Sequence, residues 1–215
     1  MDIDNVAWRS EIRNVVGVSL GEVSSLCILR AYAERETPNT PAKHYYEVKH
    51  LQHYSGMTFP QVIEDVHLIL QRLKQDCDLV LDETQVGREV SDLFKAIARP
   101  IRVNIPTSGN ETVQTGAACY TVPLSLLLSA IDARLHCGEL RLAREIMGSV
   151  DLESSLKDLR DRQTVPDIHA DTLASALAIA VWRATTKKAK FGRSRPQVNL
   201  GYAEMKRIYR RPSKF

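Results

Sequence analysis

The chain has 215 residues, 44% hydrophobic and 26% charged, which is the composition of one soluble globular domain rather than of a disordered or fibrous protein. No apolar run approaches the roughly 20 residues of a membrane-spanning helix, and the N-terminal "MDIDNVAWRSEIR" has no apolar signal-peptide core. Its net charge is +3, and its four cysteines are widely spaced, which argues against a disulfide framework or zinc site and favours a cytoplasmic protein.

The positive charge is concentrated at the C-terminus, and we expect a folded domain over residues 1–186 followed by a basic tail at 187–215. The tail contains ten Lys or Arg residues and one acid, so its net charge is about +9 and that of the remainder about −6. A basic tail on an acidic body indicates nucleic-acid binding, although a solvated terminus or a segment that docks onto a protein has the same composition. The candidate nucleic-acid-binding residues are Lys187, Lys188, Lys190, Arg193, Arg195, Lys206, Arg207, Arg210 and Arg211.

Hydrophobic periodicity predicts an α/β fold with a central mixed five-stranded sheet flanked by helices. The strand patterns are at residues 14–20, 24–33, 42–54, 78–82 and 101–106. The helix patterns are at residues 58–75, 87–98, 123–137, 152–162 and 171–185. Thr58-Phe-Pro-Gln61 has the form of a capping box, and Gly138 is a helix-ending signal. Residues 112–122 are hairpin-like, and residues 139–143 are short and extended.

Two acidic residues lie at positions where this order of elements predicts a functional site. The helix at 58–75 is a crossover that brings strand 78–82 parallel to the first strand, so Ser19 and Asp82 should be neighbours at the carboxyl ends of the two strands. Asp82, with Glu83 beside it, is a candidate metal ligand, and the alternative is a helix-capping acid. Asp171, in the first turn of the last helix, has the same two interpretations. Together the acids fit a two-metal site for Mg²⁺ or Mn²⁺.

Five segments together resemble the nuclease domain of the large terminase subunit of tailed phages, a ribonuclease-H-like fold. They are "VVGVSLG", "YYEVKHLQHYSGMTFPQVIEDVHLIL", "LVLDETQVGREVSDLF", "YTVPLSLLLSAIDARLHCGELRLA" and "ADTLASALAIAVW". The resemblance extends from about Val15 to Ala184. It implies a metal-dependent DNA endonuclease of viral DNA packaging, with Asp82 and Asp171 as its second and third acids holding Mg²⁺ or Mn²⁺. It also implies double-stranded DNA and phage packaging proteins as partners, and the host cytoplasm as the location.

The departures from the family pattern fall at or near the site. Ser19 stands where the family has its first aspartate, and a neutral hydroxyl is a poor replacement for a metal-bridging carboxylate. The other departures are Gln85, Leu124, Ala170 and Thr172, which replace a glycine, a lysine, a histidine and a second aspartate of the family. Two hypotheses remain open: a nuclease in which Glu22 or Glu83 compensates, and a non-catalytic module that binds nucleic acid or protein.

Other chemistries have weaker support in the sequence. A serine hydrolase would use Ser19 with His169 or His50, but "GVSLG" lacks the spacing and the strand-to-helix setting of a nucleophile elbow. His50 and His53 are too few for a zinc site. We find no G-x-x-x-x-G-K-[ST] phosphate loop, so we expect no nucleotide cofactor.

Overall fold

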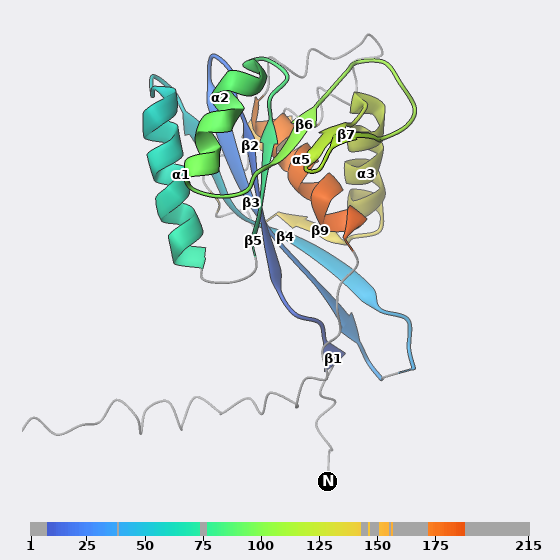
Figure 1. The fold of residues 1–215 in the computed structure, drawn as a ribbon. Helices are drawn as coiled ribbons and strands as arrows, with labels where there is room; N and C mark the ends of the chain where they lie inside the picture. Colours follow the sequence, from blue (N-terminus) through green and yellow to red (C-terminus); the bar gives the residue numbers. More distant parts are fainter. Residues whose placement is uncertain are drawn as a thin grey trace, which may run out of the picture.

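The computed structural model describes residues 8–37, 39–73, 77–142, 146, 151–154, 156 and 172–187. Within these residues, nine strands form one mixed sheet that has helices on both faces (Figure 1), which confirms the α/β class. The strands are β1 (Trp8–Arg9), β2 (Arg13–Ser19), β3 (Ser24–Arg35), β4 (Lys43–Tyr54), β5 (Cys77–Asp82), β6 (Ile101–Asn104), β7 (Val113–Gly116), β8 (Cys119–Thr121) and β9 (Leu140–Leu142). The helices are α1 (Phe59–Leu73), α2 (Gly87–Leu93), the 3₁₀ turn η1 (Phe94–Ala96), α3 (Leu124–His136) and α5 (Thr172–Thr186).

Eight strands lie in the order β7-β8-β6-β5-β2-β3-β4-β9, and β1 pairs with β3. The central strand β2 is antiparallel to β3 and parallel to β5, as the crossover argument predicts. The prediction of a five-stranded sheet is wrong. Those five strands are β2 to β6, and the additional strands β1, β7, β8 and β9 have only two to four residues each. The hairpin predicted at 112–122 is confirmed as β7 and β8, and the extended segment predicted at 139–143 contains β9. Segments this short have too little periodicity for their place in the sheet to be assigned from sequence alone.

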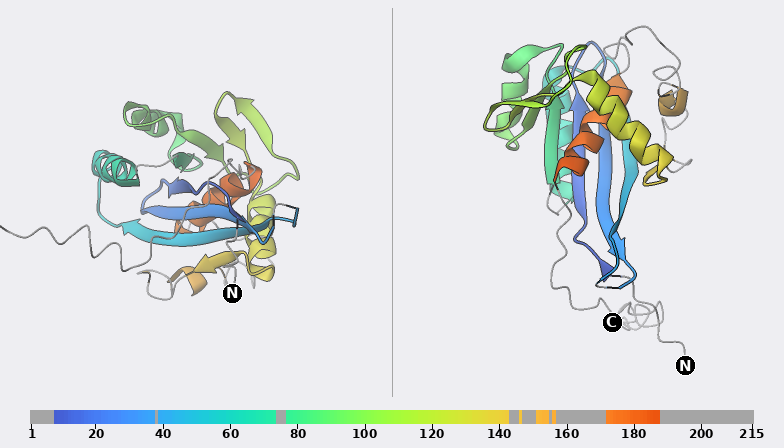
Figure 2. Two further views of the ribbon diagram at one scale, coloured as in Figure 1. Left: turned by 90° about the horizontal axis from the view of Figure 1, so that it is seen from below. Right: turned by 90° about the vertical axis from the view of Figure 1, so that its right-hand side faces the viewer.

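The helices cover the two faces of the sheet (Figure 2), and each face has its own hydrophobic core. On one face, Val62 and Val66 of α1 and Phe94 of η1 pack against β2, β3 and β5. On the other face, α5 lies between the sheet and α3, and its residues are buried from Thr172 to Trp182. A helix that is apolar all round belongs inside a domain, which is where α5 lies. None of the described helices is both long and apolar enough to cross a membrane.

Strand β2 and helix α5 approach each other closely at Gly17. A Cβ atom added to Gly17 would collide with the carbonyl oxygen of Ala176 and would lie 3.1 Å from the Cβ of Ala180. Only glycine on the strand and small residues on the helix permit this spacing, because any larger side chain would separate the two backbones. The alanine-rich composition of α5 therefore has a packing role.

Both ends of α5 are tied to the β2–β3 hairpin. At its N-terminal end, the hydroxyl of Thr172 lies 2.6 Å from Ser25 Oγ. At its C-terminal end, the guanidinium of Arg13 donates to the carbonyl oxygens of Arg183 at 3.2 Å and Lys187 at 3.3 Å. The helix is about 22 Å long and β2 about 23 Å long, so α5 runs the length of the strand in the opposite direction.

We expect Gly17→Ala to lower the free energy of unfolding by about 1–3 kcal/mol, because the added methyl group overpacks the β2–α5 contact. The control is Gly116→Ala, whose added Cβ meets its nearest neighbour, the Cys119 side chain, at an ordinary 3.5 Å. That control should change the free energy by less than about 1 kcal/mol. Urea denaturation followed by circular dichroism measures both, and equal effects would show that the Gly17 contact is not restrictive.

Candidate functional site

Four residues from four adjacent strands form a row across the sheet. Asp82 at the end of β5 is the register partner of Ser19 at the end of β2, Ser19 is the partner of Ser25 in β3, and Ser25 is the partner of His53 in β4. Register partners project to the same face of a sheet, and here that face is the one covered by α5. We call these four residues the cross-strand row. The prediction that Ser19 and Asp82 are neighbours is confirmed.

The buried carboxylate of Asp82, which is 1% exposed, accepts hydrogen bonds on both oxygens. Ser19 Oγ donates to Oδ2 at 3.1 Å, and the backbone N–H of Thr84 donates to Oδ1 at 3.0 Å. The hydroxyl of Thr84 also donates to Oδ1 and accepts from the N–H of Ile105 at 2.8 Å. These bonds close the loop after β5 as an Asx turn. Asp82 does not cap α2, because the N-cap residue of α2 is Val86.

Ser25 connects the cross-strand row to α5. Its Oγ lies 2.6 Å from the Thr172 hydroxyl and 2.8 Å from Nδ1 of His53. Ser25 is fully buried and Thr172 is 6% exposed, whereas His53 is exposed. Because buried hydroxyls need partners, this arrangement satisfies Ser25 and Thr172 together. It also leaves the imidazole as the part of the row that solvent reaches.

The other candidate residues have separate environments. Glu83 is directed toward α2, where its Oε2 accepts from Ser91 Oγ at 2.6 Å. Glu22 is exposed in the bend between β2 and β3. The side chain of Gln85 packs over Gly21. Asp171 lies outside the described residues, immediately before Thr172, and so do Ala170 and His169.

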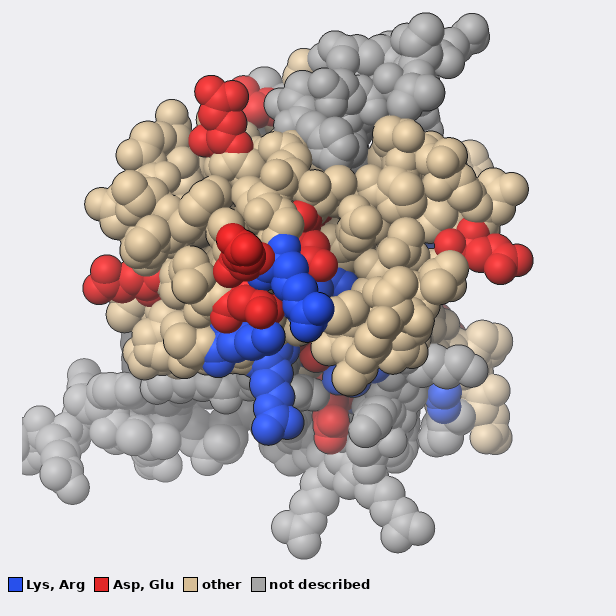
Figure 3. Space-filling model, turned by 45° about the horizontal axis from the view of Figure 1, so that its top comes forward, with Lys and Arg blue, Asp and Glu red and all other residues tan. Residues whose placement is uncertain are grey.

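The described part of the cross-strand row does not fit a two-ion metal site. Such a site needs several carboxylates to hold two divalent cations against their mutual repulsion. The row contains one carboxylate, and hydroxyl and amide donors already occupy both of its oxygens. Among the described residues, no group of three or more His, Cys, Asp or Glu side chains is arranged to hold an ion. Figure 3 shows acidic and basic side chains intermingled at the centre of the face that includes the top of Figure 1.

The basic tail starts at the far end of α5 from the cross-strand row. Lys187 is the predicted nucleic-acid-binding residue that the structure describes, and its Nζ lies 3.6 Å from Asp78 Oδ1. The helix places Lys187 about 22 Å from Thr172. The other predicted residues of the tail, Lys188 to Arg211, lie outside the described residues.

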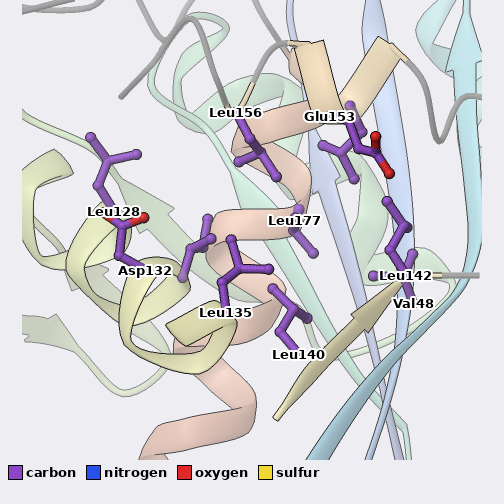
Figure 4. Close-up of a pocket in the computed structure, with 11 residues that line it drawn as sticks. Val48, Leu128, Asp132, Leu135, Leu140, Leu142, Glu153, Leu156 and Leu177 are labelled. Atoms are coloured by element: carbon purple, nitrogen blue, oxygen red, sulfur yellow. The ribbon is translucent and has the colours of Figure 1, made fainter. Parts of the chain in front are cut away.

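A cavity of about 270 Å³ lies apart from the cross-strand row, between α3, α5, β4 and β9 (Figure 4). Aliphatic side chains dominate its lining, and two carboxylates, Asp132 and Glu153, join them. The lining residues are Val48, Leu128, Ile131, Asp132, Leu135, Leu140, Leu142, Leu152, Glu153, Leu156 and Leu177. The lining is suited mainly to apolar contact, because nine of these eleven residues are aliphatic.

Sequence reasoning missed Ser25, His53 and Thr84 as members of the site. Ser25 could have been found, because a hairpin centred on Glu22 pairs Ser19 with Ser25. His53 could not, because a bulge shifts the β3–β4 register between Ile28 and Leu29. Thr84 required the conformation of the loop after β5.

The chain matches no protein-family model and no curated protein. The likeness to terminase nucleases therefore rests on the five sequence segments alone.

We expect Ser25→Ala to lower the free energy of unfolding by about 1–3 kcal/mol, because the buried Thr172 hydroxyl loses its partner. The control is Ser125→Ala, which removes an exposed hydroxyl that donates to Gly109 O at 3.3 Å and should cost less than about 0.5 kcal/mol. A Ser25→Ala/Thr172→Val double variant should cost less than the two single variants combined, because both partners are then removed. Additive costs in urea denaturation would refute the Ser25–Thr172 coupling.

Proposed function

We propose that this chain is a terminase-type, ribonuclease-H-like module that binds double-stranded DNA and hydrolyses it weakly or not at all. The observation that carries the proposal is the 3.1 Å hydrogen bond from Ser19 Oγ to Asp82 Oδ2. In the family pattern the position of Ser19 is an aspartate. Here a neutral hydroxyl donates to the acid that it would otherwise join in binding metal.

The chemical consequence follows from charge. Two carboxylates side by side repel each other and attract divalent cations, whereas a hydroxyl beside a carboxylate satisfies it without any cation. Ser25 and Thr172 extend this neutral arrangement toward α5. The cross-strand row is thus stable as a hydrogen-bonded network, and the basic tail supplies the attraction for DNA. Phage packaging proteins are the proposed protein partners, and the host cytoplasm is the proposed location.

A second candidate function is an active metal-dependent DNA endonuclease. It is favoured by the position of Asp82 at the carboxyl end of β5. It is also favoured by the contact of 2.6 Å between the hydroxyls of Thr172 and Ser25, because Thr172 follows the candidate acid Asp171 in the sequence. In this case Asp82 and Asp171 would hold Mg²⁺ or Mn²⁺, which would supply the charge stabilisation for phosphodiester hydrolysis. For Glu83 to act as an additional metal ligand, its carboxylate would first have to break its hydrogen bond with Ser91.

The two candidates are separated by the change Ser19→Asp, with Ser19→Asn as a control of the same shape without the charge. We expect Ser19→Asp to lower the melting temperature in the absence of metal, because it places a carboxylate opposite Asp82. Added Mn²⁺ should restore stability in Ser19→Asp but not in Ser19→Asn or the unchanged protein. Differential scanning fluorimetry across a Mn²⁺ series gives the measurement.

The same proteins are tested on supercoiled plasmid with Mn²⁺ or Mg²⁺. The unchanged protein should nick the plasmid weakly or not at all, and any nicking should disappear in Asp82→Ala. Rapid cleavage by the unchanged protein that is lost in Asp82→Ala would contradict the first candidate and support the second.

Deleting residues 188–215 should weaken binding to duplex DNA and flatten the dependence of log K on log salt by several units, because the deleted cations no longer displace counterions. A variant of full length with the Lys and Arg residues of 188–215 replaced by Gln should behave like the deletion, which separates charge from chain length. Fluorescence anisotropy at several salt concentrations measures both. Unchanged affinity and slope would favour protein docking as the role of the tail.

A further inference from the structure

Two tyrosines on the β3–β4 ribbon are buried outside both hydrophobic cores. Tyr32 is 6% exposed and Tyr45 is 9% exposed, but neither belongs to the core on the α1 side or the core on the α5 side. Tyr46 packs into the α5-side core, so Tyr45 projects to the α1 side of the sheet. Along β3 that core reaches Ile28, and Tyr32 is about 13 Å further along the strand.

Cations cover these rings in place of a helix. The guanidinium of Arg9 lies 4.5 Å from the centroid of the Tyr32 ring, and that of Arg141 lies 4.2 Å from the centroid of the Tyr45 ring. The two tyrosine rings are 5.2 Å apart, and Lys43 Nζ lies 5.7 Å from the Tyr45 ring. We call these five residues the cation–tyrosine face. It crosses four strands, because its members come from β1, β3, β4 and β9.

Among the described residues, the surroundings of the cation–tyrosine face carry more positive than negative charge. Arg9 pairs with Glu34 at 2.6 Å, and Glu47 pairs with Lys49 at 2.8 Å while accepting a hydrogen bond from Tyr32. Burial, together with the hydrogen bond to Glu47, raises the pKa of Tyr32 to about 12, so the ring remains neutral near pH 7. These ion pairs account for the two carboxylates and leave Lys43 and Arg141 as additional cations on the face.

We propose that the cation–tyrosine face is a docking surface for the phosphate backbone of double-stranded DNA and acts together with the basic tail. The inference rests on the proposed function and names the part of the folded domain that holds the duplex. Charge complementarity is the first argument. The second is position along the sheet: the carbonyl oxygen of Lys187, where the tail starts, accepts a hydrogen bond from Arg13 on the α5 side, and Tyr32 lies at the same end of the sheet on the opposite side, next to Ala31, the register partner of Arg13.

The burial of the tyrosines identifies the duplex backbone as the ligand. Proteins that bind single strands stack unpaired bases on exposed aromatic rings, whereas Tyr32 and Tyr45 are already covered by guanidinium groups. A guanidinium stacked on a ring still presents its N–H edge to a phosphate. Duplex DNA carries one negative charge per about 1.7 Å of its axis, so cations spread over four strands meet phosphates in any sequence.

The location also separates DNA binding from the cross-strand row. The face lies toward the end of the sheet where β2 begins, whereas Ser19 and Asp82 are at the end where β2 finishes. A duplex held by the tail and this face is therefore not required to enter the row. Such a placement suits a module that binds DNA without cutting it.

The test compares two full-length double variants that each lose two positive charges. The first is Lys43→Gln/Arg141→Gln on the cation–tyrosine face, and the control is Arg88→Gln/Lys95→Gln on α2 and η1. Binding of a fluorescein-labelled 20-base-pair duplex is measured by anisotropy across a salt series, with melting temperatures as the folding check. We expect the first variant to bind roughly 5-fold or more weakly with a salt slope lower by about 1–2 units, and the control to change by less than about 2-fold.

Each possible outcome tests a different part of the proposal. Equal behaviour of the two double variants would overturn the docking face while leaving DNA binding by the tail intact. If the unchanged protein does not bind the duplex, the proposed function fails, and the face with it. The unchanged protein could instead bind a single-stranded 20-mer or polyglutamate more tightly than the duplex. If the first variant weakens that binding, the duplex is not the ligand of the face. If the double variant is unstable, Lys43→Gln and Arg141→Gln tested singly should each lower the slope by about 1 unit.

Discussion

The contact between Gly17 of β2 and Ala176 of α5 is the packing constraint on which the arrangement of this protein depends. It allows a buried helix to lie against the central strand over the whole length of that strand. Because the helix and the strand have nearly equal lengths, fixing the crossing point also fixes what lies at each end. Thr172 meets Ser25 at one end, and Lys187 meets Arg13 at the other. The candidate site and the start of the basic tail are therefore consequences of one close approach.

The cross-strand row shows how buried polar groups can be stable without being a metal site. An ionised carboxylate removed from water is costly unless hydrogen bonds replace its hydration, and Asp82 receives such bonds from Ser19 and Thr84. Ser25 and Thr172 satisfy each other in the same way. Of the positions at which the terminase resemblance expects negative charge, those that the structure describes are thus bonded mainly through hydroxyl groups, and this is the physical basis for proposing weak or absent hydrolysis.

The β3–β4 ribbon has a different stabilisation at each end. Near Ile28 it is covered by α1, and further along it is covered by guanidinium groups stacked on Tyr32 and Tyr45. Aromatic and cation–π contacts contribute about 0.5–2 kcal/mol each, so they help to hold a ribbon that none of the described helices covers there. The same guanidinium groups remain able to bind phosphate. Stabilising the ribbon and attracting a polyanion are therefore two effects of one arrangement.

The sequence by itself determined what depends on neighbours along the chain. Periodicity located the five longer strands and α1, α3 and α5, and Gly138 ends α3 with a φ of +65° as predicted. One of the two hydrogen bonds of the predicted capping box is present, since the Gln61 side chain accepts from the Thr58 N–H. The crossover rule correctly paired Ser19 with Asp82. Only the tertiary structure decided how the short strands pair within the sheet, the direction of Glu83, the position of His53 and the end of the sheet at which α5 finishes. These features depend on hydrogen bonds and register between residues far apart in sequence, and local periodicity contains no information about them.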